Sequence, residues 1–114
     1  MNYKKLIVWQ KADQLAYQIY LISKNFPREE QFGLTSQLRR AAISIPTNIV
    51  EGTGRQSKGE TKQFVNIALG SFVEVDYLLG FCKRLEFFSE QDYPKLLQLK
   101  QEVGALLWCF YKSF

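Results

Sequence analysis

The sequence predicts an all-α fold, an antiparallel four-helix bundle with up-down-up-down topology, and three observations support it. Four stretches repeat apolar residues every three or four positions, the period of a helix with one buried side. The connections between them are short and marked by proline or glycine, which favours antiparallel neighbours. No stretch alternates strictly enough to be a strand. With 114 residues, 46 % of them hydrophobic, the chain suits a single domain, residues 1–114, with its own core.

The first predicted helix runs from about residue 8 to residue 25 and ends at Phe26-Pro27, because proline disfavours helical geometry in the residue before it. Its core face is Val8, Ala12, Leu15, Ala16, Ile19 and Ser23. The second helix follows Pro27 and ends at the glycines of residues 52–54. Its core stripe is Leu34, Leu38, Ala41, Ala42, Ile45 and Ile49. Because the apolar spacing continues across Pro46, we predict a helix that is kinked there and does not stop.

Ser57 begins the third predicted helix, and Glu60 three positions later completes a capping-box pattern. Its core stripe is Phe64, Ala68, Ser71, Val75, Leu78, Cys82 and Leu85. Ser89 and Asp92 begin the fourth helix, and Pro94 suits its first turn. Its stripe is Leu96, Leu99, Val103, Leu106 and Phe110.

A second apolar stripe lies beside the core stripe on the third and fourth helices. Its residues are Val65, Leu69, Phe72 and Leu79 on the third, and Leu97, Trp108 and Tyr111 on the fourth. A lone bundle needs one apolar stripe per helix. The extra stripe therefore predicts a subunit interface and a homo-oligomer, and a wide core within one subunit is the alternative.

Nothing in the sequence points to catalysis, a metal or a cofactor. The absence of histidine excludes Ser–His and Cys–His pairs and the commonest general base. The glycines between residues 52 and 59 match neither a Walker loop nor a dinucleotide fingerprint. Cys82 and Cys109 lie in apolar helical stretches, where a reduced thiol acts as a small core residue. No signal peptide is recognisable, and no apolar run approaches the roughly 18 residues of a membrane span. We expect a non-enzymatic cytoplasmic protein that has no contact with a membrane.

The net charge of +4 and the isoelectric point near 9.1 favour contact with a polyanion. Between residues 39 and 62 the cations outnumber the acids Glu51 and Glu60. These cations are Arg39, Arg40, Arg55, Lys58 and Lys62. The segment also carries a polar ridge with helical spacing. Its residues are Gln37, Arg40, Ser44, Asn48, Glu51 and Arg55. Three interpretations stay open: a solvated face, a buried polar network across a subunit boundary, and direct contact with phosphates.

The same residues resemble a known family. The matching positions are Leu6, Trp9 and Ala12, Phe26-Pro27, Gly33-Leu34, QLRRAAISIPTNIVEG (residues 37–52), Arg55, Ser57, Glu60, Phe64 and Ala68-x-Gly70-Ser71. This pattern resembles the four-helix-bundle proteins of intervening sequences within bacterial 23S ribosomal RNA genes. It is more distantly similar to the accessory variability determinant of diversity-generating retroelements. The resemblance implies a ring-shaped homopentamer associated with nucleic acid and, in the retroelement relatives, with a reverse transcriptase.

Two functions are compatible with these observations. In the first, an oligomeric bundle binds RNA or DNA through the five cations with little sequence specificity. In the second, the bundle is a scaffold without direct nucleic-acid contact, and its partner is a protein such as a reverse transcriptase or another nucleic-acid-handling protein.

Overall fold

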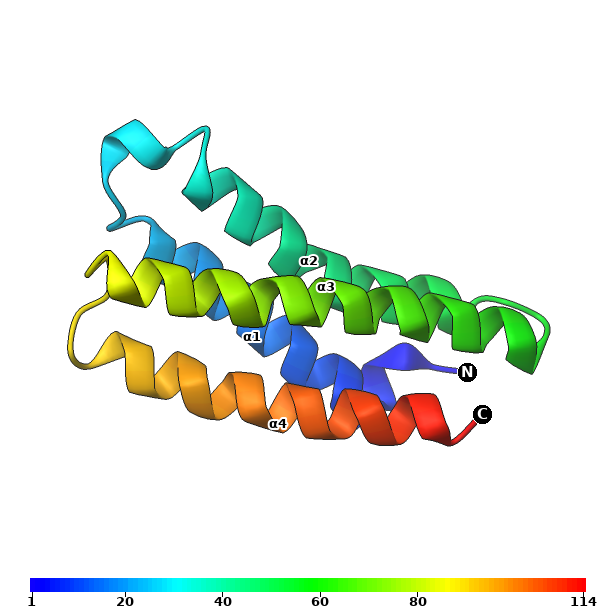
Figure 1. Cartoon of the computed structure of the whole chain (residues 1–114). Helices are drawn as coiled ribbons and strands as arrows, with labels where there is room; N and C mark the ends of the chain where they lie inside the picture. Colours follow the sequence, from blue (N-terminus) through cyan, green and yellow to red (C-terminus); the bar gives the residue numbers. More distant parts are fainter.

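The computed structural model describes all 114 residues and contains four α-helices and no strand (Figure 1). The helices are α1 (Ile7–Ser23), α2 (Leu34–Thr53), α3 (Lys58–Arg84) and α4 (Asp92–Lys112). Two short 3-10 helices, η1 (Tyr3–Lys5) and η2 (Arg28–Glu30), precede α1 and α2. The predicted all-α four-helix bundle is confirmed.

The helices lie side by side in an elongated body of 43 × 25 × 20 Å. α1 packs against α2 and α4, and α3 packs against the same two helices, so neighbours in sequence are neighbours in space and α4 closes the square. The chain reverses direction at each connection (Figure 1). Both termini and the α2–α3 turn lie at one end of the bundle, and the other two connections lie at the opposite end.

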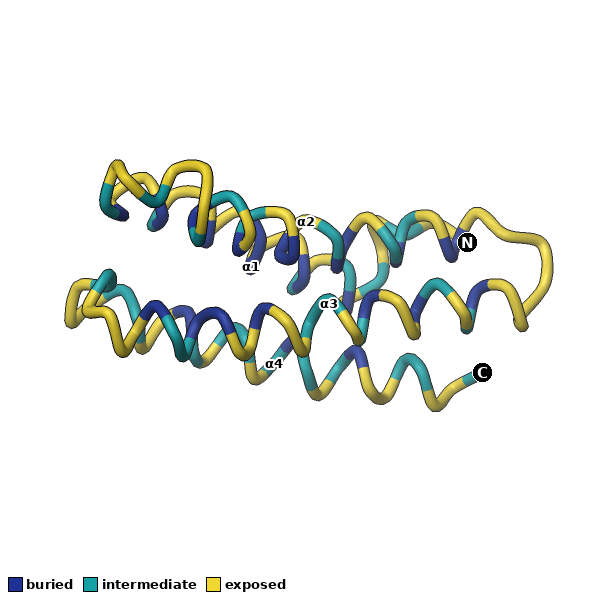
Figure 2. The backbone as a smooth tube through the Cα atoms, turned by 45° about the horizontal axis from the view of Figure 1, so that its top comes forward, coloured by how far each residue is buried: buried dark blue, intermediate teal, exposed yellow.

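One core of 20 buried hydrophobic residues receives side chains from all four helices. Buried positions follow the inner sides of the helices, and exposed ones follow the outer sides (Figure 2). All six residues predicted for the core face of α1 are buried. Five of the six on α2 are buried, and Leu34 is half-buried. For these two helices the apolar period was sufficient to identify the buried side.

The helix α2 continues through Pro46, as the apolar spacing predicted. Pro46 has no N–H to donate to the carbonyl of Ala42, so this backbone hydrogen bond is missing from the helix. The ring is nevertheless buried beside Ile45 and Ile49, and its burial offsets part of that loss. A bend at this position stays a prediction.

The buried face of α3 differs from the predicted one. Val65 and Leu79 were predicted to lie in a subunit interface, but they are 0 % and 2 % exposed within the single subunit and belong to its core. Phe64 and Ser71, predicted for the core, are only half-buried, and Leu85 is exposed. The interface prediction was therefore wrong for Val65 and Leu79.

The close crossing of α2 and α3 explains this rotation. The Thr61 hydroxyl donates a hydrogen bond of 2.8 Å to the carbonyl of Gly52. A Cβ atom on Gly52 would lie only 3.1 Å from the Cβ atom of Phe64, so the absence of a side chain lets the two backbones approach. This contact turns Thr61, and Val65 one turn later, toward the core.

α4 shows a smaller difference. Leu96 and Val103 are buried as predicted, and Leu107, which was not predicted, is buried with them. The other three predicted residues, Leu99, Leu106 and Phe110, are half-buried and pack against the core.

α3 is long and apolar enough to cross a membrane when judged by length and composition alone, although no such run was expected. A core helix meets the same criteria. In this bundle one side of α3 builds the core, and Asp76 on its outer side forms an ion pair with Lys100 of α4. Two apolar stripes on one helix account for its high mean hydropathy.

Serine hydroxyl groups bind N–H groups at the beginning of α3 and α4. Ser57 is the N-cap of α3, as predicted, whereas Ser89 lies two residues before Gln91, the N-cap of α4, which makes no side-chain cap. The Ser57 hydroxyl oxygen accepts the N–H of Glu60 at 3.1 Å and lies 3.2 Å from the Glu60 carboxylate. The Ser89 hydroxyl oxygen accepts the N–H of Asp92 at 3.1 Å. Each hydroxyl satisfies one N–H group that the helix itself leaves free.

α3 is followed by a residue with left-handed backbone geometry, Glu86, whose φ is 62° and which lies two positions after the end of the helix. The N–H of Phe87 donates to the carbonyl of Cys82 at 3.1 Å, and the N–H of Glu86 donates to that of Lys83 at 2.9 Å. This is the Schellman arrangement, in which glycine is the preferred residue at the left-handed position. A residue with a Cβ atom there costs about 1 kcal/mol.

Glu86→Gly is therefore expected to raise the free energy of unfolding by about 0.5 kcal/mol, since relief of the Cβ strain exceeds the added freedom of the unfolded chain. The urea midpoint measures the change. Glu90→Gly is the control, because Glu90 is exposed and its φ is not positive. A lower midpoint for Glu86→Gly than for the parent would contradict the assignment.

Candidate nucleic-acid interface

The net positive charge is concentrated at the end of the bundle that holds both termini and the α2–α3 turn. Six cations lie there against the two acids Glu51 and Glu60, whereas the other nine of the 15 cations are matched by the other nine of the 11 acids. The whole net charge of +4 thus belongs to this end. We call it the basic end, and its cations are Lys4, Lys5, Arg55, Lys58, Lys62 and Lys112.

Three of the five cations predicted to bind nucleic acid lie at the basic end. The Arg55 guanidinium lies 4.5 Å from the ring centroid of Phe64, and the Lys62 ammonium lies 4.7 Å from that of Tyr111. Lys58 is exposed in the first turn of α3. Neither of the ion pairs in the structure involves these side chains, so their charges are not neutralised by a carboxylate.

Aromatic rings alternate with cations on the surface next to this cluster. The rings of Trp108 and Tyr111 are stacked, with centroids 5.6 Å apart and 14° between their planes. Lys62 lies over Tyr111, and Lys112 lies 5.6 Å from the Trp108 centroid. We call this set the aromatic–cation row. Trp108 is 50 % exposed, so part of its ring is available for contact. Such a surface offers charges for phosphates and ring faces for bases.

The other two predicted cations, Arg39 and Arg40, lie away from the basic end in the N-terminal half of α2. The Arg39 guanidinium donates to the Ser23 hydroxyl at 2.7 Å and to the Tyr20 carbonyl at 3.1 Å, which links α2 to α1. Arg40 is exposed and lines a small cavity of about 270 Å³ that Glu74 also lines. The structure therefore does not bring these two arginines together with the other three.

The polar ridge of α2 is hydrogen-bonded only in its middle. The Asn48 amide donates to the carbonyl of Ser44 at 2.8 Å and to its hydroxyl oxygen at 2.9 Å. The Ser71 hydroxyl donates to the Ser44 hydroxyl oxygen at 2.8 Å and so joins α3 to the ridge. Gln37 and Glu51 are exposed and make no side-chain hydrogen bond within the subunit. Ser71 was not predicted to join the ridge, because its spacing placed it in the core stripe.

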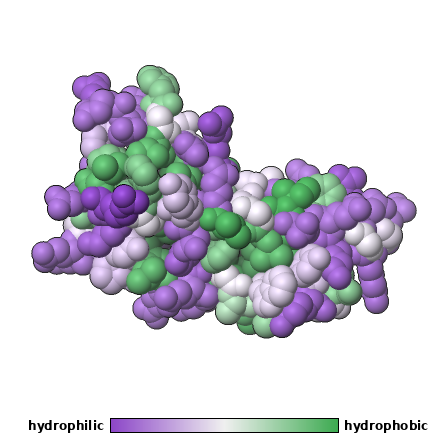
Figure 3. All heavy atoms as spheres, viewed as in Figure 1, coloured by the Kyte–Doolittle hydropathy of each residue, from purple (hydrophilic) through white to green (hydrophobic).

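An apolar groove lies between α3 and α4, next to the aromatic–cation row. Its volume is about 720 Å³, and it is lined by Asn66, Leu69, Gly70, Phe72, Val73, Gly104, Ala105 and Trp108. Val73 is 64 % exposed in the single subunit. Figure 3 shows hydrophobic side chains in the middle of the face formed by α3 and α4. Leu69, Phe72 and Trp108 of the predicted interface line this α3–α4 groove, whereas Leu97 is half-buried elsewhere on α4.

The two thiols lie in different environments. Cys82 is buried, and burial together with the negative charge of Glu30 raises the pKa of its thiol from 9.0 to about 11. Cys109 is exposed, contrary to the expectation that both thiols fill the core. No group of three or more metal-ligating carboxylate, thiol or imidazole side chains is present.

At about pH 8 we expect only Cys109 to react with a thiol reagent, because the thiolate is the nucleophile and Cys82 stays protonated and covered below its raised pKa. Ellman's reagent should titrate one thiol quickly and the second only after denaturation. Cys109→Ser should abolish the fast phase. Two fast thiols in the folded protein would contradict the burial of Cys82.

Comparison with known proteins identifies relatives over almost the whole chain. The profile of a family described as "23S rRNA-intervening sequence protein" matches residues 4–109. The chain is 27 % identical to a protein with unknown function from the S23 ribosomal protein family from Bacteroides thetaiotaomicron VPI-5482, whose crystal structure superposes with a TM-score of 0.84. This similarity covers 98 % of the present chain and 99 % of that one. No curated protein matches the sequence. By this match, the chain belongs to the 23S rRNA-intervening sequence protein family.

Proposed function

We propose that this protein is a non-enzymatic, cytoplasmic, homo-oligomeric bundle that binds RNA or DNA through its basic end with little sequence specificity. The observation that supports it best is the concentration of the entire net charge of +4 at one end of the bundle. Contacts between cations and phosphates supply most of the affinity in non-specific binding and carry no sequence information.

The α2–α3 turn supplies the first set of contacts in this proposal. Arg55, Lys58 and Lys62 are free of ion pairs and flank the N-terminus of α3, where the helix dipole is positive. Glu60 in the same turn offsets part of this charge. The resulting field attracts phosphates in general, because contacts between cations and phosphates do not depend on the neighbouring base.

The aromatic–cation row supplies the second set. A base released from its neighbours can stack on the exposed part of Trp108 while Lys62 or Lys112 meets the adjoining phosphate. Bases inside a duplex cannot stack in this way. The row therefore favours single strands over double strands.

The α3–α4 groove supports self-assembly. An exposed apolar groove on a small bundle has an unfavourable contact with water that a second subunit would remove. The resemblance to the family implies a ring of five subunits. Repetition of the basic end around such a ring would bring many cations to one nucleic-acid strand and raise the overall affinity.

Fluorescence anisotropy with labelled single- and double-stranded RNA and DNA tests the proposal. The logarithm of the binding constant should fall linearly with the logarithm of salt concentration, with a slope of about −0.7 to −0.9 per phosphate contacted. Unrelated sequences should bind alike, and single strands should bind more tightly than duplexes of the same length. Non-specific binding to nucleic acid is typically detectable at about 50 μM protein in low salt. If no probe binds under these conditions, the scaffold function with a protein partner is the better proposal.

A further inference from the structure

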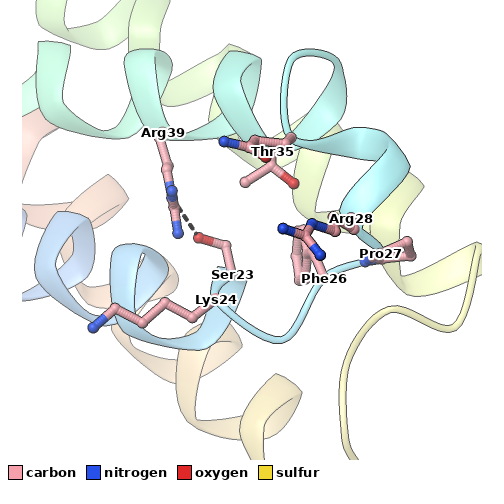
Figure 4. A pocket seen from close by; sticks show the side chains of 8 residues that line it. Ser23, Lys24, Phe26, Pro27, Arg28, Thr35 and Arg39 are labelled. Carbon is pink, nitrogen blue, oxygen red and sulfur yellow. Dashed lines mark hydrogen bonds between the residues drawn. The ribbon is translucent and has the colours of Figure 1, made fainter.

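A second group of cations lies at the opposite end of the bundle, where the connection between α1 and α2 packs on both helices. Together with polar side chains it lines a pocket of about 400 Å³ (Figure 4). The polar lining consists of Ser23, Lys24, Arg28, Gln31, Thr35 and Arg39. No carboxylate lines the pocket, although cations and acids are equal in number in the part of the chain outside the basic end.

Thr35 provides the first evidence that the pocket is a binding site. Its side chain is buried, with 5 % exposure, and its hydroxyl oxygen has no hydrogen-bond partner within the chain. Buried hydroxyl groups are normally hydrogen-bonded, because removing them from water without a partner is unfavourable. In Figure 4 this hydroxyl points into the pocket, toward the side where the Arg28 guanidinium lies. Thr35 also lies in the first turn of α2, at the positive end of the helix dipole.

The cations around Thr35 are available to a ligand. Lys24 and Arg28 are exposed and take part in neither ion pair. Two N–H groups of Arg39 are held by Ser23 and the Tyr20 carbonyl, so its guanidinium is fixed in place while its remaining N–H groups stay free. The carboxylate of Glu30, four residues before α2 begins, accepts the N–H of Leu34 at 3.1 Å and does not line the pocket.

We propose that this pocket binds a phosphomonoester group, with Lys24, Arg28 and Arg39 as counter-charges and Thr35 as a hydroxyl donor. A phosphomonoester carries between one and two negative charges and three terminal oxygens, which matches several cations plus a neutral donor better than a carboxylate does. An arginine can pair with two phosphate oxygens at once. A pocket of this size is within the usual range for small-molecule sites. The group belongs either to a small metabolite or nucleotide or to the end of a nucleic-acid strand.

Isothermal titration calorimetry with inorganic phosphate, adenosine 5′-monophosphate, adenosine and acetate tests the proposal. Phosphate and the monophosphate should bind, while adenosine and acetate should not. Arg28→Gln should lower the affinity for the monophosphate about tenfold, as expected for loss of a charge-assisted pair. Arg40→Gln is the matched control, an exposed arginine outside the pocket, and should change the affinity less than about twofold. The proposal would be overturned if neither phosphate nor the monophosphate binds at about 10 mM, because a dissociation constant above this concentration is weaker than that of a specific small-ligand site.

Thr35→Val separates binding from folding. Valine has nearly the same shape, so loss of an unpartnered hydroxyl should leave the melting temperature unchanged or raise it. The affinity for the monophosphate should nevertheless fall about fivefold, the effect of one lost hydrogen bond. If the affinity is unaltered, or if Arg40→Gln weakens binding as much as Arg28→Gln does, the pocket is not the site.

The pocket and the basic end can be tested independently. A variant with Arg55, Lys58 and Lys62 replaced by alanine should bind the monophosphate as the parent does, and loss of that binding would refute the pocket. Comparison of oligonucleotides with a 5′-phosphate and a 5′-hydroxyl then identifies the source of the group. A preference for the 5′-phosphate that Arg28→Gln removes indicates a strand end, and equal binding of both indicates a small phosphorylated molecule.

Discussion

Simultaneous replacement of Arg55, Lys58 and Lys62 with alanine is expected to lower the affinity for single-stranded nucleic acid about 100-fold at low salt. Each lost cation contact should also reduce the slope of the log–log salt dependence by about 0.7. The physical reason is that each phosphate a cation neutralises releases condensed counterions, and this release drives association. Anisotropy measured over a salt series gives both quantities from one set of samples.

The control for this variant carries the same change in charge at the opposite end. Lys83, Arg84 and Lys95 are exposed near the α3–α4 connection, and their replacement by alanine also removes three positive charges. The affinity of this control variant should stay within about threefold of the parent's, because its charges lie at the far end of a body 43 Å long, beyond the Debye length of about 30 Å in 0.01 M salt. Equal losses in the two variants would mean that total charge, and not the basic end, determines binding. Melting curves should accompany both, since loss of the Arg55–Phe64 contact costs about 0.5–1 kcal/mol.

Val73→Glu is expected to convert the proposed oligomer into monomers. Val73 is 64 % exposed in the single subunit, so glutamate is tolerated there as long as the α3–α4 groove faces water. In an interface the same carboxylate would be buried without a partner, which costs several kcal/mol. Sedimentation equilibrium at micromolar concentration should therefore give a multiple of 13.3 kDa for the parent and one subunit for the variant.

A control variant and the choice of Val73 make this test specific. Ile43→Glu places a carboxylate on α2, at a residue that is 44 % exposed and does not line the groove, and it should not change the mass. Phe72 is a poor probe, because a Cβ atom on Gly104 would lie 2.6 Å from its ring, and a charge in such a packed position would also disturb the fold. A monomeric parent would refute assembly, and an oligomeric Val73→Glu variant would refute the groove as its interface.

The sequence was sufficient for those parts of the fold that depend on a clear helical period. α1 and α2 each have one apolar stripe, so the buried side was identified almost residue by residue. α3 has apolar residues around much of its circumference, and the period alone could not distinguish Phe64 from Val65 as the buried one. The distinction depends on Gly52, where the backbones of α2 and α3 approach closely. That contact joins two helices and has no signature in the pattern of either.

The candidate sites were predictable only where their residues are close in sequence. Arg55, Lys58 and Lys62 stood out because they surround one turn. Lys4, Lys5 and Lys112 join them only after the chain has folded and brought both termini to the same end. The pocket beside Thr35 was not predicted, because an unpartnered hydroxyl is a property of burial and not of sequence. Arg39 was wrongly grouped with the cations of the turn, because proximity along the chain does not show that its side chain is held by Ser23.

Both termini leave the bundle beside the basic end, and this arrangement determines where the protein can be modified for experiments. An acidic affinity tag on either terminus would compete with nucleic acid for the nearby lysines, and a histidine-rich tag would add contacts of its own at low pH. A fluorescent label attached through Glu90→Cys, in a chain whose exposed Cys109 is replaced by serine, would instead lie in the exposed α3–α4 connection, at the other end of a body 43 Å long. Binding measured with an untagged chain labelled there reports on the protein's own surface.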